Sequence, residues 1–86
     1  MSRVLVTGAA SGLGAALVAR FVADGHQVLS TDVAEDGGTS YLKLDVRNPA
    51  DWDAAVAWCT DNWGGLDILV NNAGIATGGR IEVETL

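Results

Sequence analysis

Val4-Leu5-Val6-Thr7-Gly8-Ala9-Ala10-Ser11-Gly12-Leu13-Gly14 is the stretch that decides the fold of this 86-residue chain. Its apolar start is too short for a helix and leads through three glycines into a helical pattern, which predicts strand, loop and helix. Gly8 permits a tight turn off the strand, because glycine adopts positive φ freely. Gly12 lets a pyrophosphate approach the backbone, and Gly14 lets the helix pack close to the sheet. The N–H groups at the helix start then suit a diphosphate without any lysine or arginine in the loop.

The rest of the chain alternates strand and helix patterns. Further strands are predicted at Gln27–Asp32, Tyr41–Val46 and Leu66–Val70. A second helix begins at Asn48-Pro49, with Asn48 as its N-cap and Asp51 reaching back as in a capping box, and it ends at Gly64-Gly65. One stripe of this helix carries apolar residues: Trp52, Ala55, Val56, Cys59 and Trp63. Residues 75–86 have no clear periodicity.

These elements predict an α/β fold in the sequence β-α-β-β-α-β. Right-handed crossovers place the second and third strands on one side of the first strand and the fourth on its other side. The sheet is therefore expected to be parallel, of the doubly wound Rossmann type, with strand order 3-2-1-4. A ligand should bind at the switch point between the first and fourth strands, where the glycine loop lies.

Composition narrows the possible classes of protein. Eighty-six residues form one domain at most, and 49% hydrophobic residues argue against disorder. A net charge of −6 argues against a nucleic-acid or anionic-membrane partner. The single cysteine, Cys59, excludes an internal disulfide and is expected to be a small core residue. Met1-Ser2-Arg3 has no signal-peptide layout and no apolar run could cross a bilayer, so we expect a cytoplasmic protein.

Asp32 closes the second strand about 20 residues past the glycine loop. A carboxylate there would accept hydrogen bonds from adenosine ribose hydroxyls and repel a 2′-phosphate, which selects NAD over NADP. The alternative interpretation is that Asp32 only ends a strand.

The order and spacing of the motifs resemble the short-chain dehydrogenase/reductase family. Thr7-Gly8-x3-Gly12-x-Gly14 is similar to its cofactor loop, and Asn71-Asn72-Ala73-Gly74 to its Asn-Asn-Ala-Gly motif. The resemblance implies that Asp45 meets the adenine amino group and that the Val46 N–H meets a ring nitrogen. NADP-preferring members usually have a basic residue where this chain has Ser11 or Val33. The implied cofactor-binding residues are Gly8, Ser11, Gly12, Leu13, Gly14, Asp32, Asp45, Val46, Asn72, Ala73 and Gly74.

The resemblance covers only the first third or so of a typical family member. The family's catalytic serine and Tyr-x3-Lys pair come later in its sequence, and Tyr41-x-Lys43 has the wrong spacing. We therefore expect residues 1–86 to be a partial NAD-binding domain of an oxidoreductase acting on an alcohol/carbonyl pair, inactive without the catalytic part. The alternative is a stand-alone, non-catalytic dinucleotide-binding module. His26 has no neighbouring nucleophile or second ligand in the sequence and is expected to face solvent.

The fourth strand is expected to form an exposed edge. Its backbone would be unpaired, and Val4, Val6, Ile68 and Val70 would be partly uncovered, because the family's later elements normally lie there. Such an edge favours pairing with another chain. We therefore expect self-association, or pairing with the missing part.

Overall fold

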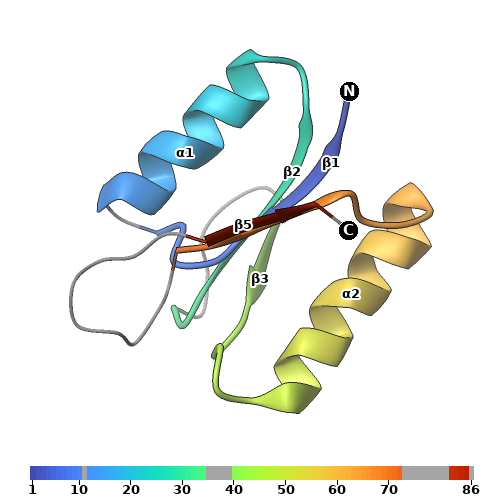
Figure 1. The fold of residues 1–86 in the computed structure, drawn as a ribbon. Coiled ribbons are helices and arrows are strands. Elements are labelled where there is room, and N and C mark those ends of the chain that lie inside the picture. The colour runs from blue at the N-terminus through green and yellow to red at the C-terminus, as the bar shows by residue number, and fades with distance from the viewer. Residues whose placement is uncertain (11, 35–39, 73–81, 86) are drawn as a thin grey trace.

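The computed structural model describes residues 1–10, 12–34, 40–72 and 82–85, the last four by their backbone. Two helices cover opposite faces of one twisted sheet (Figure 1). In chain order the elements are β1 (Arg3–Val6), α1 (Gly12–Ala23), β2 (Gln27–Asp32), β3 (Tyr41–Lys43), α2 (Pro49–Trp63), β4 (Ile68–Asn71) and β5 (Glu82–Thr85). Neither of the two helices in these ranges is long and apolar enough to cross a membrane.

The sheet has the order β3-β2-β1-β4-β5, and β1 to β4 run parallel. The predicted α/β class and the 3-2-1-4 order are confirmed. β1 is the central strand: Leu5 pairs with Leu29 of β2 on one side and with Leu69 of β4 on the other. All four parallel strands therefore direct their carboxyl ends to one edge of the sheet.

β5 corrects the prediction that β4 has an unpaired edge. Residues Glu82–Thr85 run antiparallel to β4, with Val83 opposite Val70. The sequence Glu-Val-Glu-Thr has no apolar run. An antiparallel strand is held to its neighbour by backbone hydrogen bonds, which do not require apolar side chains. The argument for self-association through the β4 edge no longer holds, because the chain pairs that edge itself.

Each face of the sheet has its own core. On one face Val4, Val6 and Val70 are fully buried, with Leu17, Val18 and Phe21 of α1 packed against the cluster. The expectation that these three valines are partly uncovered is wrong, because α1 and the neighbouring strands cover them. Ile68 is half-buried, as expected.

The second core lies beneath α2. It contains Leu5, Leu29, Leu44, Ala55 and Cys59, all at most 1% exposed. Cys59 is thus a core residue, as predicted, and burial raises the pKa of its thiol. Val56 lies off the buried stripe and is exposed, whereas Trp58, which was not assigned to the stripe, packs against the core.

The turn before α2 differs from the predicted capping box. The Asn48 side chain caps the helix by accepting from the Ala50 N–H at 3.0 Å. Asp51, however, accepts from the Asp45 N–H at 2.9 Å. The Asn48 N–H already donates to the Asp45 carbonyl at 2.9 Å, so Asp51 has no need to satisfy it.

An ion pair joins β1 to the start of β4 at the amino end of the sheet. The Arg3 guanidinium donates to both Asp67 oxygens, at 2.9 and 2.8 Å, and to the Trp63 carbonyl at 3.2 Å. The two guanidinium bonds to Asp67, together with one from the Arg3 N–H, lower the pKa of Asp67 to about 2. His26 lies at the same end, where Nδ1 accepts from the Ser2 N–H at 2.9 Å. The prediction that His26 faces solvent is wrong, because its ring is half-buried and packs edge-on against Phe21.

Candidate functional site

The glycine loop lies at the carboxyl end of β1 and is bonded to the strands on both sides. On the β2 side, the Ala9 N–H donates to the Thr31 carbonyl at 3.0 Å and the Ala10 N–H to the Asp32 carboxylate at 2.9 Å. On the β4 side, the Thr7 N–H donates to the Val70 carbonyl at 3.0 Å. The loop therefore has a fixed position at the predicted switch point.

Thr7 and the two asparagines join the loop to the end of β4. Thr7 is buried, with 1% of its surface exposed. Its hydroxyl accepts from the Asn72 N–H at 3.0 Å and donates to the Asn71 amide oxygen at 3.1 Å. The Asn72 side chain in turn donates to the Gly8 carbonyl at 3.1 Å. The expected tie between strands through an asparagine amide is present. Thr7 is therefore a further residue of the site, and its position next to Gly8 in the loop motif is the sequence signal for it.

Gly14 is required where α1 contacts the Gly8 carbonyl and the Asn72 side chain bonded to it. A Cβ on Gly14 would collide with the Gly8 carbonyl oxygen and would lie 2.6 Å from the Asn72 amide nitrogen. We predicted close packing of the helix on the sheet. The structure shows that the contact is with the loop backbone and the Asn72 amide.

Gly12 leaves open space at the start of α1. Its φ is +58°, and among the described residues a Cβ built there would meet no atom within 4 Å outside its own stretch of chain. The first N–H groups of a helix lack partners within the helix and carry the positive end of its dipole. Leu13 follows as an exposed residue of the first turn. Open space beside such N–H groups fits a diphosphate.

Asp32 has a second role that the sequence did not indicate. One oxygen accepts from the Ala10 N–H of the loop, and the other accepts from the Val33 N–H at 2.7 Å. Asp32 therefore orders the glycine loop as well as ending β2. A carboxylate has about four acceptor positions, so it keeps capacity for ligand hydroxyls.

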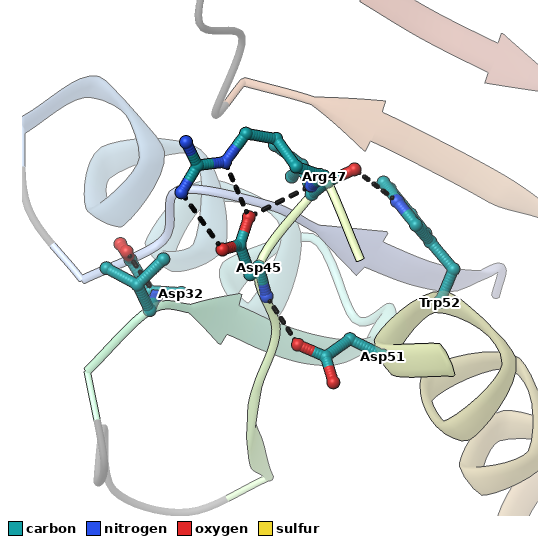
Figure 2. Close-up of polar contacts among 7 residues, drawn as sticks. Asp32, Asp45, Arg47, Asp51 and Trp52 are labelled. Atoms are coloured by element: carbon teal, nitrogen blue, oxygen red, sulfur yellow. Dashed lines mark hydrogen bonds and ion pairs between the residues drawn. The ribbon is translucent and has the colours of Figure 1, made fainter. Parts of the chain in front are cut away.

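Asp45 follows β3 at the same end of the sheet, one residue after Leu44, whose N–H donates to the Asp32 carbonyl at 2.7 Å. Its carboxylate accepts from Arg47 three times, and Figure 2 shows the guanidinium folded back over it. These bonds lower the pKa of Asp45. Asp51 and Trp52 of α2 fix the backbone around it, the latter through its indole N–H and the Val46 carbonyl at 2.8 Å (Figure 2). The pairing of Arg47 with Asp45 was not predicted, although the two residues are only two positions apart in the sequence.

The structure brings the predicted site residues to one edge of the sheet. Those around the loop are Gly8, Gly12, Leu13, Gly14, Asp32 and Asn72, and those after β3 are Asp45 and Val46. Ser11, Ala73 and Gly74 lie outside the described residues. Within residues 1–10, 12–34 and 40–72, no group of histidine, cysteine or acidic residues could hold a metal ion.

Comparison with known proteins agrees with this geometry. Residues 2–85 match the short chain dehydrogenase family, and the chain belongs to that family. It is 42% identical over 88 residues to 3-alpha-(or 20-beta)-hydroxysteroid dehydrogenase of Mycobacterium tuberculosis, covering 91% of this chain and 34% of that protein. It is 40% identical over 85 residues to NADP-dependent 3-hydroxy acid dehydrogenase YdfG of Escherichia coli K12, covering 87% of this chain and 34% of that protein.

A solved structure extends the likeness to three dimensions. The 3-alpha-hydroxysteroid dehydrogenase from Pseudomonas sp. B-0831, complexed with NADH, matches with a TM-score of 0.67 and 37% identity. The match covers 86% of this chain and 31% of that one. This chain thus spans about a third of the length of the relatives that it matches.

Proposed function

We propose that this chain is the NAD(H)-binding part of a short-chain oxidoreductase that acts on an alcohol/carbonyl pair. The observation that carries the proposal is the glycine loop, tied to β2 and β4, with open space where Gly12 begins α1. In this assignment the pyrophosphate lies against the N–H groups of Gly12, Leu13 and Gly14. The nicotinamide ring supplies hydride transfer when the cofactor is bound.

The adenosine half is assigned to the ends of β2 and β3. Asp32 would accept hydrogen bonds from the ribose hydroxyls through the acceptor positions that Ala10 and Val33 leave free. Asp45 and the Val46 N–H would meet the adenine edge. Each of these groups lies at the carboxyl end of a parallel strand, where the open α/β folds bind ligands.

Preference for NAD over NADP is part of the proposal. The Asp32 carboxylate would repel a 2′-phosphate, and the exposed Val33 beside it offers no positive charge. The relatives differ in this respect, since one is named NADP-dependent and another is complexed with NADH. The preference therefore rests on the local residues of this chain.

Catalysis is proposed to require residues beyond these 86. The single tyrosine, Tyr41, donates its hydroxyl to the Ala34 carbonyl at 2.7 Å on the β3 side of the sheet. The single lysine, Lys43, follows at a spacing that differs from the family's catalytic pair. The second candidate, a stand-alone binding module, would keep the same cofactor site without turnover. A cytoplasmic location stays a prediction.

Fluorescence titration with NADH and NADPH tests the proposal. The unmodified protein should bind NADH more tightly, by about tenfold or more. Asp32→Asn with Val33→Arg should reverse the preference, because it removes the repulsive charge and adds a cation while keeping an acceptor for the Ala10 N–H. Asp24→Asn is the matched control, since it removes an exposed carboxylate at the far end of α1.

Four outcomes separate the alternatives. Equal affinity of the unmodified protein for both nucleotides would refute the NAD preference, and no binding of either would refute the function. Hydride transfer to NAD from alcohols by the 86-residue segment would refute the proposed need for further residues. Tight NADH binding by a full protein that turns over no alcohol or carbonyl compound would favour the binding module.

A further inference from the structure

Tyr41 is anchored to β2 by its backbone and reaches back to the end of that strand with its side chain. Tyr41 pairs with Ser30 of β2, and the Ser30 N–H donates to the Ser40 carbonyl at 2.9 Å. Ser40 has a φ of +51°, in the left-handed region that residues other than glycine seldom adopt. Tyr41 is half-buried, and its hydroxyl donates to the Ala34 carbonyl at 2.7 Å. Tyr41 therefore ties the turn that follows β2 to the start of β3.

The turn held by this bond contains Val33, which orients the Asp32 carboxylate. The Val33 N–H donates to one Asp32 oxygen at 2.7 Å, and the Ala10 N–H of the glycine loop donates to the other at 2.9 Å. Val33 and Ala34 are both exposed, so packing does little to hold them. The Tyr41 hydroxyl restrains the chain at Ala34, one residue beyond the Val33 N–H. The orientation of the carboxylate thus depends on the glycine loop at one oxygen and on this turn at the other.

A fixed carboxylate distinguishes NAD from NADP more sharply than one that can rotate. With two of its about four acceptor positions filled by backbone N–H groups, Asp32 keeps about two for the neighbouring hydroxyls of a ribose. A 2′-phosphate replaces one of these donors and brings a negative charge against the carboxylate. A carboxylate free to rotate would turn away from the phosphate and would hold the two hydroxyls less well. The difference between the two affinities would then become smaller.

We propose that Tyr41 is a specificity-determining positioning residue, whose hydroxyl holds the turn after β2 and thereby fixes Asp32 for the selection of NAD over NADP. The inference rests on the proposed function, because Asp32 selects between nucleotides only if this edge of the sheet binds them. It gives a role outside catalysis to the tyrosine whose spacing from Lys43 differs from the family's catalytic pair. In this role Tyr41 contacts the backbone of the protein and acts on the nucleotide through Asp32.

Tyr41→Phe tests this role, because it removes the hydroxyl and keeps the ring. Fluorescence titrations give the preference for NADH, expressed as the Kd for NADPH divided by the Kd for NADH. This preference should fall by about threefold, the effect of losing one hydrogen bond of ordinary strength. The fall should come from weaker binding of NADH, with NADPH bound as well as before or better. A general loosening of the protein would instead weaken both nucleotides together and leave the preference unchanged.

Two further variants and one spectrum complete the experiment. Thr60→Val is the matched control, since it removes another exposed hydroxyl that donates to a backbone carbonyl, that of Val56 on α2 at 3.1 Å, and it should leave the preference unchanged. In an Asp32→Ala background, Tyr41→Phe should have no further effect on the preference, because Asp32 is the residue through which it acts. The amide proton of Val33 reports on the turn, and its nuclear magnetic resonance shift should change in Tyr41→Phe but not in Thr60→Val.

The outcomes separate this role from the proposed function. An unchanged preference in Tyr41→Phe, or an equal decrease in the Asp32→Ala background, would refute the role of Tyr41 and leave the proposed function standing. An unshifted Val33 amide proton would refute the restraint on the turn. Equal affinity of the unmodified protein for both nucleotides would refute the NAD preference and the role of Tyr41 with it. No binding of either nucleotide would refute the proposed function and this inference together.

Discussion

Gly14→Ala should destabilise the protein, although alanine is the better helix former. Gly14 has no positive φ, so the substitution alone would stabilise a helix by about 1 kcal/mol. The new Cβ would collide with the Gly8 carbonyl oxygen and lie 2.6 Å from the Asn72 amide nitrogen. Overpacking of this kind costs about 1–3 kcal/mol, and loss of the Asn72–Gly8 hydrogen bond costs about 1 kcal/mol more. The net loss of unfolding free energy is therefore about 1–3 kcal/mol.

Urea unfolding measures this change. With an m-value of about 1 kcal/mol/M, the midpoint should fall by about 1–3 M. Ala16→Gly is the control, because Ala16 is exposed on the same helix and loses only about 1 kcal/mol of helix propensity. NADH affinity should fall in Gly14→Ala and remain unchanged in Ala16→Gly. A Gly14→Ala protein as stable as the unmodified one would refute the reasoning.

Three further predictions follow from single positions. Gly12→Ala and Gly25→Ala both place a side chain at positive φ, +58° and +87°, where no atom from elsewhere in the described residues lies within 4 Å. Both variants should lose about 1 kcal/mol of stability, but only Gly12→Ala should weaken NADH binding in a titration. Equal NADH affinity in the two variants would show that the Gly12 space binds no phosphate. The pKa of Asp67 is about 2 in the folded protein, against 3.8 for the free side chain, so the stability due to its pair with Arg3 should be complete above pH 4 and disappear as the pH falls toward 2. In thermal unfolding curves measured across this pH range, Asp67→Asn should abolish this pH-dependent loss of stability. A loss of the same size in the variant would assign it to another group. Cys59 is 0% exposed with a raised thiol pKa, so a thiol reagent should modify it only after unfolding, and rapid native labelling would contradict the described core.

The first β-α-β unit could be predicted from the sequence because its signals are local. The apolar run of β1, the glycines and the helical spacing of α1 all lie within residues 4–23. Asp32 and Asn72 were placed correctly near the loop because parallel strands end at one edge. The bond from the Ala10 N–H to Asp32 was missed, since it depends on how the loop turns after Gly8.

Other features depend on chain geometry that no local pattern encodes. β5 is held by backbone pairing with β4 and has no apolar run to identify it. Arg3 and Asp67 are 64 positions apart, so only the sheet brings them together. The sequence allowed Asp51 to accept from the Asn48 N–H, but the turn before α2 places its carboxylate against the Asp45 N–H. Arg47 differs from these, because its proximity to Asp45 in the sequence made their pairing predictable.

The central position of β1 has a mechanical consequence. β1 is hydrogen-bonded along both sides, to β2 and to β4, and all three strands run in the same direction. A force that pulls the amino end of β1 away from the carboxyl end of β4 would load the rungs between them in shear. The evenly spaced bonds of a parallel pair would then have to break together rather than one after another. The strand that carries the glycine loop should therefore resist extension along this direction more strongly than β5, which is joined to β4 at one side.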